Sequence, residues 1–198
     1  RYDKRPEQSD LELITKIASV PIEGNIPLAK LPDGFNTRQP KESHDIEYVH
    51  QFYTRRSLHV LAALRKRAMA SHFPREISFL INSYDLTHST LMSRVIFKGG
   101  GKKPVLTGYQ SGTLYVSSLP VEKNLIEGLR KQKLGVIVES LQHIRSAQFV
   151  STGSAANLDI PDDSVDYIFI DPPFGGNIMY SELNFLSESW LGVHTNNK

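Results

Sequence analysis

The sequence contains no cysteine among its 198 residues. A disulfide framework and a thiolate zinc site are therefore both excluded. No stretch approaches the roughly 20 consecutive apolar residues that a helix needs to span a bilayer. The first ten residues are charged and polar, unlike a secretory signal. These absences predict a cytoplasmic protein with no membrane partner.

Closely spaced histidines are also missing. The seven histidines stand at positions 44, 50, 59, 72, 88, 143 and 194. No pair has the short spacing of a metal site, and no Ser/His/Asp set can be assigned. We therefore expect neither a metal site nor nucleophilic catalysis.

The composition predicts a folded core. Hydrophobic residues make up 39% and charged residues 22% of the chain, as in ordinary globular proteins, and the length fits one domain. The chain begins with Arg1 and not with methionine. We expect a processed protein or a piece of a longer one.

An apolar run that ends in two prolines is the most informative feature of the chain. Residues 165–170 are rich in β-branched and aromatic side chains, which predicts a short buried strand. Pro172 and Pro173 have no N–H to donate to a ladder, so the strand must end there. Gly175 and Gly176 then permit a sharp turn at the carboxyl end of the strand, where open α/β sheets bind their ligands.

The tetrapeptide Asp171-Pro172-Pro173-Phe174 resembles motif IV of the amino-methyltransferases that use S-adenosylmethionine, whose signature is Asp/Asn/Ser-Pro-Pro-Tyr/Phe/Trp. The resemblance implies that Asp171 and the neighbouring carbonyl accept hydrogen bonds from an exocyclic amino group, which frees its nitrogen lone pair. Phe174 would stack on a base extruded from the duplex. An Asp-Pro-Pro sequence after a strand also occurs where it only forms a turn and has no catalytic role. The implied site comprises the catalytic residues Asp171, Pro172, Pro173 and Phe174 and the base-pocket residues Phe174, Asn177 and Tyr180.

Three stretches, in the same order, resemble a group of large bacterial DNA methylases. Residues 164–192 are similar to its motif IV region, in which the tetrapeptide leads into a helix that ends in Trp-Leu-Gly. Residues 48–58 resemble its Phe-Tyr-Thr-x-Arg-Asn-Leu segment, with Ser57 where asparagine is usual. Residues 112–116 and 121–124 form the third similar stretch. The implied fold is α/β, a partial doubly wound Rossmann-like methyltransferase sheet with flanking helices.

The cofactor loop of such enzymes, a Phe-x-Gly-x-Gly sequence, is not found. Residues 97–101 read Phe-Lys-Gly-Gly-Gly, but we expect no apolar strand before them, and they do not meet the P-loop spacing. We interpret residues 97–104 as a loop that can touch DNA backbone. In the group that the chain resembles, the cofactor loop lies upstream. We therefore expect the S-adenosylmethionine site to be completed by a part of the polypeptide outside this chain.

Charge is unevenly distributed. Residues 54–103 hold ten Lys/Arg against two acidic residues, a balance of +8, whereas residues 159–188 hold seven carboxylates and no Lys or Arg. A basic region can neutralise phosphates, which favours DNA as a partner, although any single basic residue is more simply explained as a solvated helix face. The candidate contacts to DNA backbone are Arg55, Arg56, Lys66, Arg67, Lys102 and Lys103.

The chain divides into two predicted parts. Residues 1–45 contain five prolines and are expected to be extended and turn-rich, with one possible strand at 11–19. Residues 46–198 are expected to be the motif IV-bearing part of a methyltransferase catalytic domain. Predicted helices span 54–70, 75–95, 121–145 and 177–191, and predicted strands lie at 112–117, at 165–170 and within 147–157. Arg65 conflicts with this pattern, because it falls on the apolar side of the first helix.

Three functions remain open from the sequence. The first is part of a site-specific DNA methyltransferase of restriction-modification or phage-defence type, which transfers a methyl group from S-adenosylmethionine to the exocyclic amino group of a flipped adenine or cytosine. The second is a non-catalytic nucleic-acid-binding or scaffold module derived from the same fold. The third is methyl transfer to RNA or to a protein glutamine.

Overall fold

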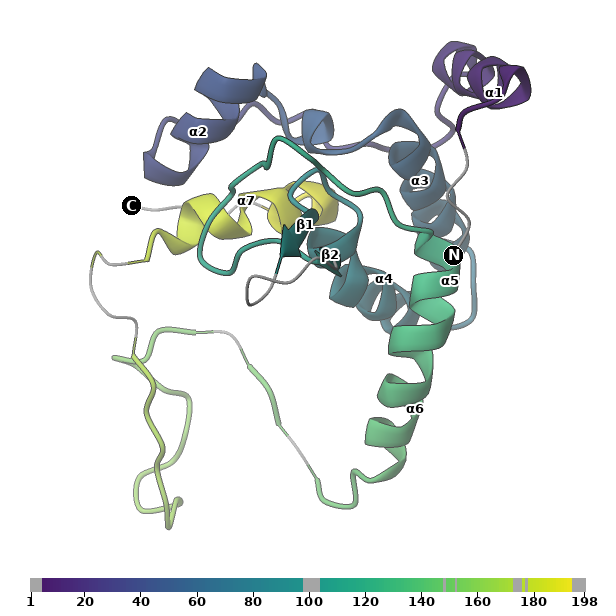
Figure 1. Ribbon diagram of the computed structural model, residues 1–198. Helices are drawn as coiled ribbons and strands as arrows, with labels where there is room; N and C mark the ends of the chain where they lie inside the picture. Colours follow the sequence, from purple (N-terminus) through teal and green to yellow (C-terminus); the bar gives the residue numbers. More distant parts are fainter. Residues whose placement is uncertain are drawn as a thin grey trace.

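The computed structural model describes residues 5–97, 104–147, 149–151, 153–172, 176 and 178–193. This part of the chain is mainly helical, with a small two-stranded sheet (Figure 1). The elements in chain order are α1 (Gln8–Ser19), α2 (Phe35–His44), the 3-10 helix η1 (Val49–Phe52), α3 (Arg55–Met69), α4 (Pro74–His88), β1 (Arg94–Phe97), β2 (Pro104–Thr107), α5 (Leu125–Gly128), the π-helical turn η2 (Leu129–Leu134), α6 (Gly135–Gln142) and α7 (Tyr180–Leu191).

Helices α3 and α4 form the centre of the fold. The side-chain oxygen of Thr54 accepts a hydrogen bond from the Ser57 amide at 3.1 Å, which satisfies one of the free N–H groups at the start of α3. Pro74 opens α4, where its missing N–H costs no helical hydrogen bond. The helix predicted at 54–70 is thereby confirmed. The largest fully buried side chains of the core include Phe52, Leu61, Ile81, Met92, Leu114 and Leu186.

Helix α1 replaces the strand that we expected within residues 11–19, and that expectation is wrong. The Asp10 carboxylate accepts a hydrogen bond from the Glu7 amide at 2.9 Å, which completes a capping box at the start of the helix. At the other end, the Arg55 guanidinium donates to the carbonyls of Ile17 at 3.2 Å and Val20 at 2.8 Å. These end contacts fix a helix in a sequence whose apolar residues also fit a strand.

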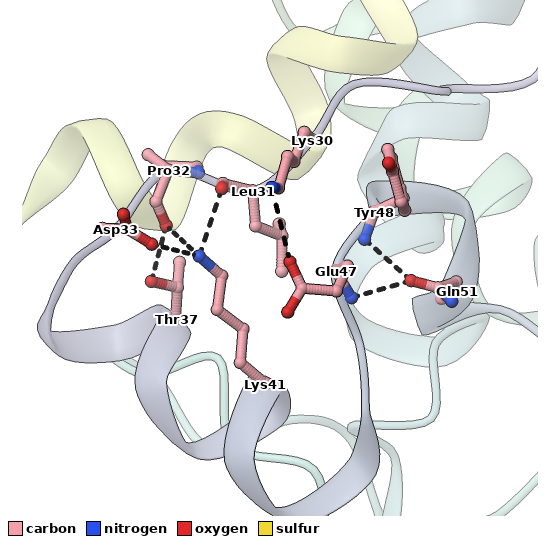
Figure 2. A network of polar contacts seen from close by, with 9 residues as sticks. All are labelled: Lys30, Leu31, Pro32, Asp33, Thr37, Lys41, Glu47, Tyr48 and Gln51. Carbon is pink, nitrogen blue, oxygen red and sulfur yellow. Dashed lines mark hydrogen bonds and ion pairs between the residues drawn. The ribbon is translucent and has the colours of Figure 1, made fainter.

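Helix α2 is fastened to the loop before it by the ammonium of Lys41 (Figure 2). This Nζ donates to the Leu31 carbonyl at 3.3 Å, the Pro32 carbonyl at 3.1 Å and the Asp33 carboxylate at 2.6 Å. Hydrogen bonding to Lys41 lowers the pKa of the Asp33 carboxyl below its usual value. Two helices thus lie within residues 1–45, and the proposed domain boundary at residue 45 stays a prediction.

The described residues contain one small sheet in place of the expected doubly wound one. β1 and β2 pair antiparallel, with Arg94 opposite Thr107 and Phe97 opposite Pro104. The expected central strand at 165–170 does not form, and Phe169 within it is 80% exposed. A strand needs neighbours that bond its backbone and cover its side chains, and no described segment supplies them here.

The strands expected at 112–117 and within 147–157 are also absent from the described residues. Residues 112–117 are nevertheless well packed, since Leu114 and Val116 are buried. The side-chain amide of Gln39 bonds both backbone groups of Val116, donating to its carbonyl at 2.9 Å and accepting from its amide at 3.1 Å. A glutamine side chain thus does what a neighbouring strand was expected to do.

The remaining helices differ from prediction mainly at their ends. The helix expected at 75–95 stops at His88. Residues 94–97 form β1, so a strand ends at Phe97 directly before the lysine and glycines at 98–101, contrary to our expectation. The helix expected at 121–145 is the continuous run α5, η2 and α6. The helix expected at 177–191 is α7. None of the helices in the described part combines the length and the apolar character needed to cross a bilayer.

Candidate functional site

The structure describes two residues of the motif, and neither is packed against the helical body. Asp171 and Pro172 are exposed and belong to no helix or strand. Pro173, Phe174 and Asn177 lie outside the described residues. Tyr180 is the first residue of α7, and 44% of it is exposed. The described residues therefore do not assemble the base pocket, and the roles given to these residues stay predictions.

Helix α7, which follows the motif, is anchored in the core at its far end by Trp190. Its indole N–H donates to the Tyr53 hydroxyl at 2.9 Å. The two rings meet edge to face, with centroids 5.7 Å apart, a favourable aromatic geometry. Burial, reinforced by the Asp85 carboxylate, raises the pKa of the Tyr53 hydroxyl well above its usual range. The phenol is therefore neutral and accepts a hydrogen bond from the indole.

Arg65 connects this aromatic pair to α4. Its guanidinium lies over the Trp190 ring at 4.6 Å from the centroid, within the range of a cation–π contact. The same group donates to the Asp85 carboxylate at 2.9 Å and to the Asn82 side-chain oxygen at 2.8 Å. Burial raises the pKa of Asp85, although Arg65 and Ser89 act in the opposite direction. This explains why Arg65 lies on the apolar side of α3: its guanidinium pairs with the buried Asp85 carboxylate.

A second junction joins the start of α3 to residues 121–124. The Glu122 carboxylate accepts hydrogen bonds from the Thr54 hydroxyl at 2.5 Å and the Arg56 Nε at 3.0 Å, and it also pairs with an Arg56 terminal nitrogen. Partial burial works to raise the pKa of Glu122, but these donors together hold it below its ordinary value. The carboxylate is therefore ionised and fully engaged.

The two junctions unite the stretches that resemble the DNA methylases. Trp190 belongs to residues 164–192, Tyr53 and Thr54 belong to residues 48–58, and Glu122 belongs to the third stretch. The Trp190–Tyr53 contact spans 137 positions and the Thr54–Glu122 contact spans 68. Segments far apart in the sequence are thus bound directly to one another.

The candidate DNA contacts have mixed surroundings. Arg55 is occupied by the end of α1, and Arg56 is occupied by Glu122. The Lys66 ammonium lies 3.6 Å from the exposed Glu23 carboxylate, and Arg67 is exposed on α3. Lys102 and Lys103 lie outside the described residues. Contact of these six residues with DNA stays a prediction.

Comparison with protein-family models, with curated proteins and with solved structures finds no match to this chain. Within the described part, no three histidine or acidic side chains are grouped closely enough to hold a metal ion.

Sequence reasoning missed the residues that join the elements. Trp190 was expected to pack in the core, but its partner Tyr53 was identified only as part of a similar stretch, and Glu122 had no assigned role. One signal was available for the buried network, since Arg65 stood on an apolar face and therefore needed an acidic partner. The identity of that partner, Asp85, depends on how α3 and α4 pack, which local sequence does not specify.

Proposed function

We propose that this chain is the target-amine part of a DNA methyltransferase that uses S-adenosylmethionine to methylate the exocyclic amino group of a flipped adenine or cytosine. One observation carries the proposal: the three stretches that resemble the DNA methylases are bound together through Trp190, Tyr53, Thr54 and Glu122. An accidental resemblance of separate stretches gives no reason for them to share contacts.

In the proposed reaction, Asp171 and the carbonyl beside it hold the amino group of the base. An aryl amine is a poor nucleophile because its lone pair is delocalised into the ring. Acceptors for its two hydrogens favour the pyramidal form, in which the lone pair is free to attack. Phe174 stacks on the extruded base, and Asn177 and Tyr180 line the pocket. S-adenosylmethionine supplies the methyl group when bound, and no residue of this chain is assigned to the cofactor.

The exposed apolar run supports a second component that completes the sheet. Tyr167, Ile168, Phe169 and Ile170 are each at least 70% exposed. Four consecutive large apolar side chains in water are unfavourable by the usual area rule. We propose that these residues become the central strand of the doubly wound sheet when the cofactor-binding part of the same polypeptide is present.

Calorimetric titration of S-adenosylmethionine into this chain tests whether the cofactor site lies outside the chain. The expected result is no binding at cofactor concentrations up to about 1 mM, a range that detects even affinities of about −4 kcal/mol. Micromolar binding would show that the cofactor site lies within the chain and would overturn the division into two parts.

Replacing Asp171 with Ala in the complete polypeptide tests the chemistry. Methyl transfer from radiolabelled S-adenosylmethionine to duplex DNA should fall at least about 10²-fold, the usual effect of removing one polar group that acts in the transition state. Duplex binding should persist. Asp162→Ala provides the matched control, since Asp162 is another exposed carboxylate nearby. If the protein methylates only RNA or protein, its substrate is not DNA. If the unmodified protein transfers no methyl group, the chain is a non-catalytic binding module.

A further inference from the structure

Two cavities lie side by side where residues 121–124 enter α5. The first, of about 380 Å³, is bounded by the start of α3, and the second, of about 400 Å³, is bounded by α4, β2 and η2. Glu122, Lys123 and Asn124 line both of them. We call the two cavities together the Lys123 cleft. Arg56 and Glu122, which form the junction described above, line the first cavity, but no role proposed above uses Lys123, Asn124 or Tyr84.

The carboxylates of the cleft and the Asn124 side-chain oxygen are already occupied. Glu122 is bound by Thr54 and Arg56, and the Glu127 carboxylate lies 2.6 Å from the Lys131 ammonium. The Asn124 side-chain oxygen caps α5 by accepting from the Glu127 amide at 3.1 Å. The amide nitrogen of Asn124 is left as a free donor within the described residues.

Lys123 is the uncompensated charge of the cleft. No carboxylate among the described residues pairs with it, and partial burial alone lowers its pKa. The pKa of the neighbouring His88 falls to about 4, first because of burial and then because of the charges of Lys123 and Lys133. Lys133 therefore adds to the positive potential at this place, while the two carboxylates of the cleft, Glu122 and Glu127, are paired with Arg56 and Lys131.

Tyr84 adds a neutral donor on a ring that packs in the core. Its ring stacks on His88 with centroids 4.3 Å apart, and only 2% of the residue is exposed. Tyr84 and Gly128 both line the second cavity, and a Cβ at Gly128 would lie 1.9 Å from the Tyr84 hydroxyl oxygen. Glycine is therefore required for the hydroxyl to reach this position. In the described part of the chain, the Tyr84 hydroxyl has no hydrogen-bond partner. Gly128 is followed by the turn η2, which is π-helical, a feature frequent at functional sites.

We propose that the Lys123 cleft binds a phosphate group, with the Lys123 ammonium as the counter-charge and the Asn124 amide and the Tyr84 hydroxyl as donors. A site with free donors and paired carboxylates favours a ligand that only accepts, and a phosphate diester is such a ligand. We assign this phosphate to the DNA backbone, and this assignment rests on the proposed function. The cleft thus adds backbone contacts that charge counting along the sequence did not identify.

Fluorescence anisotropy with a labelled 20-base-pair duplex tests the assignment. Lys123→Gln should weaken binding about 5- to 10-fold at 50 mM salt and reduce the slope of log affinity against log salt by about one. Lys123→Arg should retain most of the affinity, because it keeps the charge. Tyr84→Phe should weaken binding about 2- to 3-fold without changing the slope, since the lost donor is neutral. Lys30→Gln is the charge-matched control, because Lys30 lies outside the cleft and is 67% exposed.

Calorimetric titration of inorganic phosphate and of a 5′-mononucleotide separates the two sources of phosphate. One outcome is that phosphate or the mononucleotide binds, that Lys123→Gln abolishes this binding, and that the duplex does not bind. This would support the cleft as a phosphate site and overturn its assignment to DNA backbone. Duplex binding that Lys123→Gln and Lys30→Gln reduce equally would overturn the cleft and leave the proposed methyltransferase function intact. Absence of binding to every probe would overturn the cleft.

Discussion

Arg65 shows how a charged side chain can be part of a helical core. Only 14% of its side chain is exposed, and it contacts Asp85 and Asn82 on α4 and Trp190 on α7. Removing two ions from water is costly, and the cost is recovered only when good geometry and further hydrogen bonds are present. The guanidinium meets this condition through one terminal nitrogen, which donates to two oxygens, while its face covers the indole. The residue therefore specifies how α3, α4 and α7 meet.

Arg65→Gln should destabilise the chain by about 3 to 5 kcal/mol, because the Asp85 carboxylate would stay buried without its partner. Urea unfolding followed by the fluorescence of Trp190, the one tryptophan of the chain, measures the change. The matched control is Arg67→Gln on the exposed side of the same helix, which should change stability by less than about 0.5 kcal/mol. Asp85→Asn in the Arg65→Gln background should recover part of the loss. Equal stability of the two single variants would contradict the account.

The pH dependence of Arg65→Gln has a definite sign. The pKa of Asp85 in the folded chain is raised above its ordinary value of 3.8, first by burial. The folded state therefore holds the proton more tightly than the unfolded chain, and the penalty for the buried charge is relieved as pH falls through the folded-state pKa. Without Arg65 the pKa rises further, so the stability gap to Arg67→Gln should narrow between pH 7 and about pH 4. A gap that widens on acidification would show that Asp85 is not the cause.

At the scale of elements, side chains from distant segments fasten the short helices. Glu182 of α7 accepts hydrogen bonds from the Phe35 amide at 3.2 Å and the Asn36 amide at 2.7 Å, the first N–H groups of α2. A carboxylate in this position satisfies free donors and complements the positive end of the helix. Gly34 leaves the necessary space, because a Cβ there would lie 2.1 Å from a Glu182 carboxylate oxygen.

Glu182→Ala should cost about 1 to 2 kcal/mol, the usual effect of losing a helix cap. Amide hydrogen exchange is the informative measurement, since the loss should accelerate exchange in α2 while the amides of α3 and α4 keep their protection. Gly34→Ala should produce the same pattern by displacing the carboxylate. Asn184→Ala, on the exposed side of α7, serves as the control. Uniform acceleration across all helices would indicate a global effect and would contradict this local role.

Local signals in the sequence predicted elements well where the whole cause is local. Thr54, Pro74 and apolar periodicity mark α3 and α4, and both helices begin within one residue of the expected position. The prediction failed for α1, because residues 11–19 fit either periodicity and the deciding contacts involve Arg55, far along the chain. It failed again at residues 112–117, where the partner of the backbone is the side chain of Gln39. Contacts between distant residues are what local pattern reading cannot supply.

At the scale of the whole molecule, the helical body is packed, while the described residues 153–172, which lead into the motif, are exposed. The described residues between 143 and 172 loop away from the helices and return only at α7 (Figure 1). The apolar run at 165–170 was expected to be a buried strand, and this is wrong for the described chain, because burial depends on neighbours that the chain does not provide. The candidate site could be predicted only as a motif, because its pocket requires residues brought together by a sheet.

This separation gives opposite expectations for one substitution in two contexts. In this chain, Ile168→Asp should change the free energy of unfolding by less than about 0.5 kcal/mol, because Ile168 is 70% exposed. Ile81→Asp, the matched substitution at a position only 2% exposed, should cost more than about 4 kcal/mol. In the complete polypeptide, where we propose that residues 165–170 form a central strand, Ile168→Asp should be as damaging as Ile81→Asp and should abolish methyl transfer. A large effect of Ile168→Asp in this chain would show that the run is already buried. If the complete protein tolerates the aspartate, the segment does not enter the sheet, and the assignment of Asp171 to the carboxyl end of a central strand is wrong.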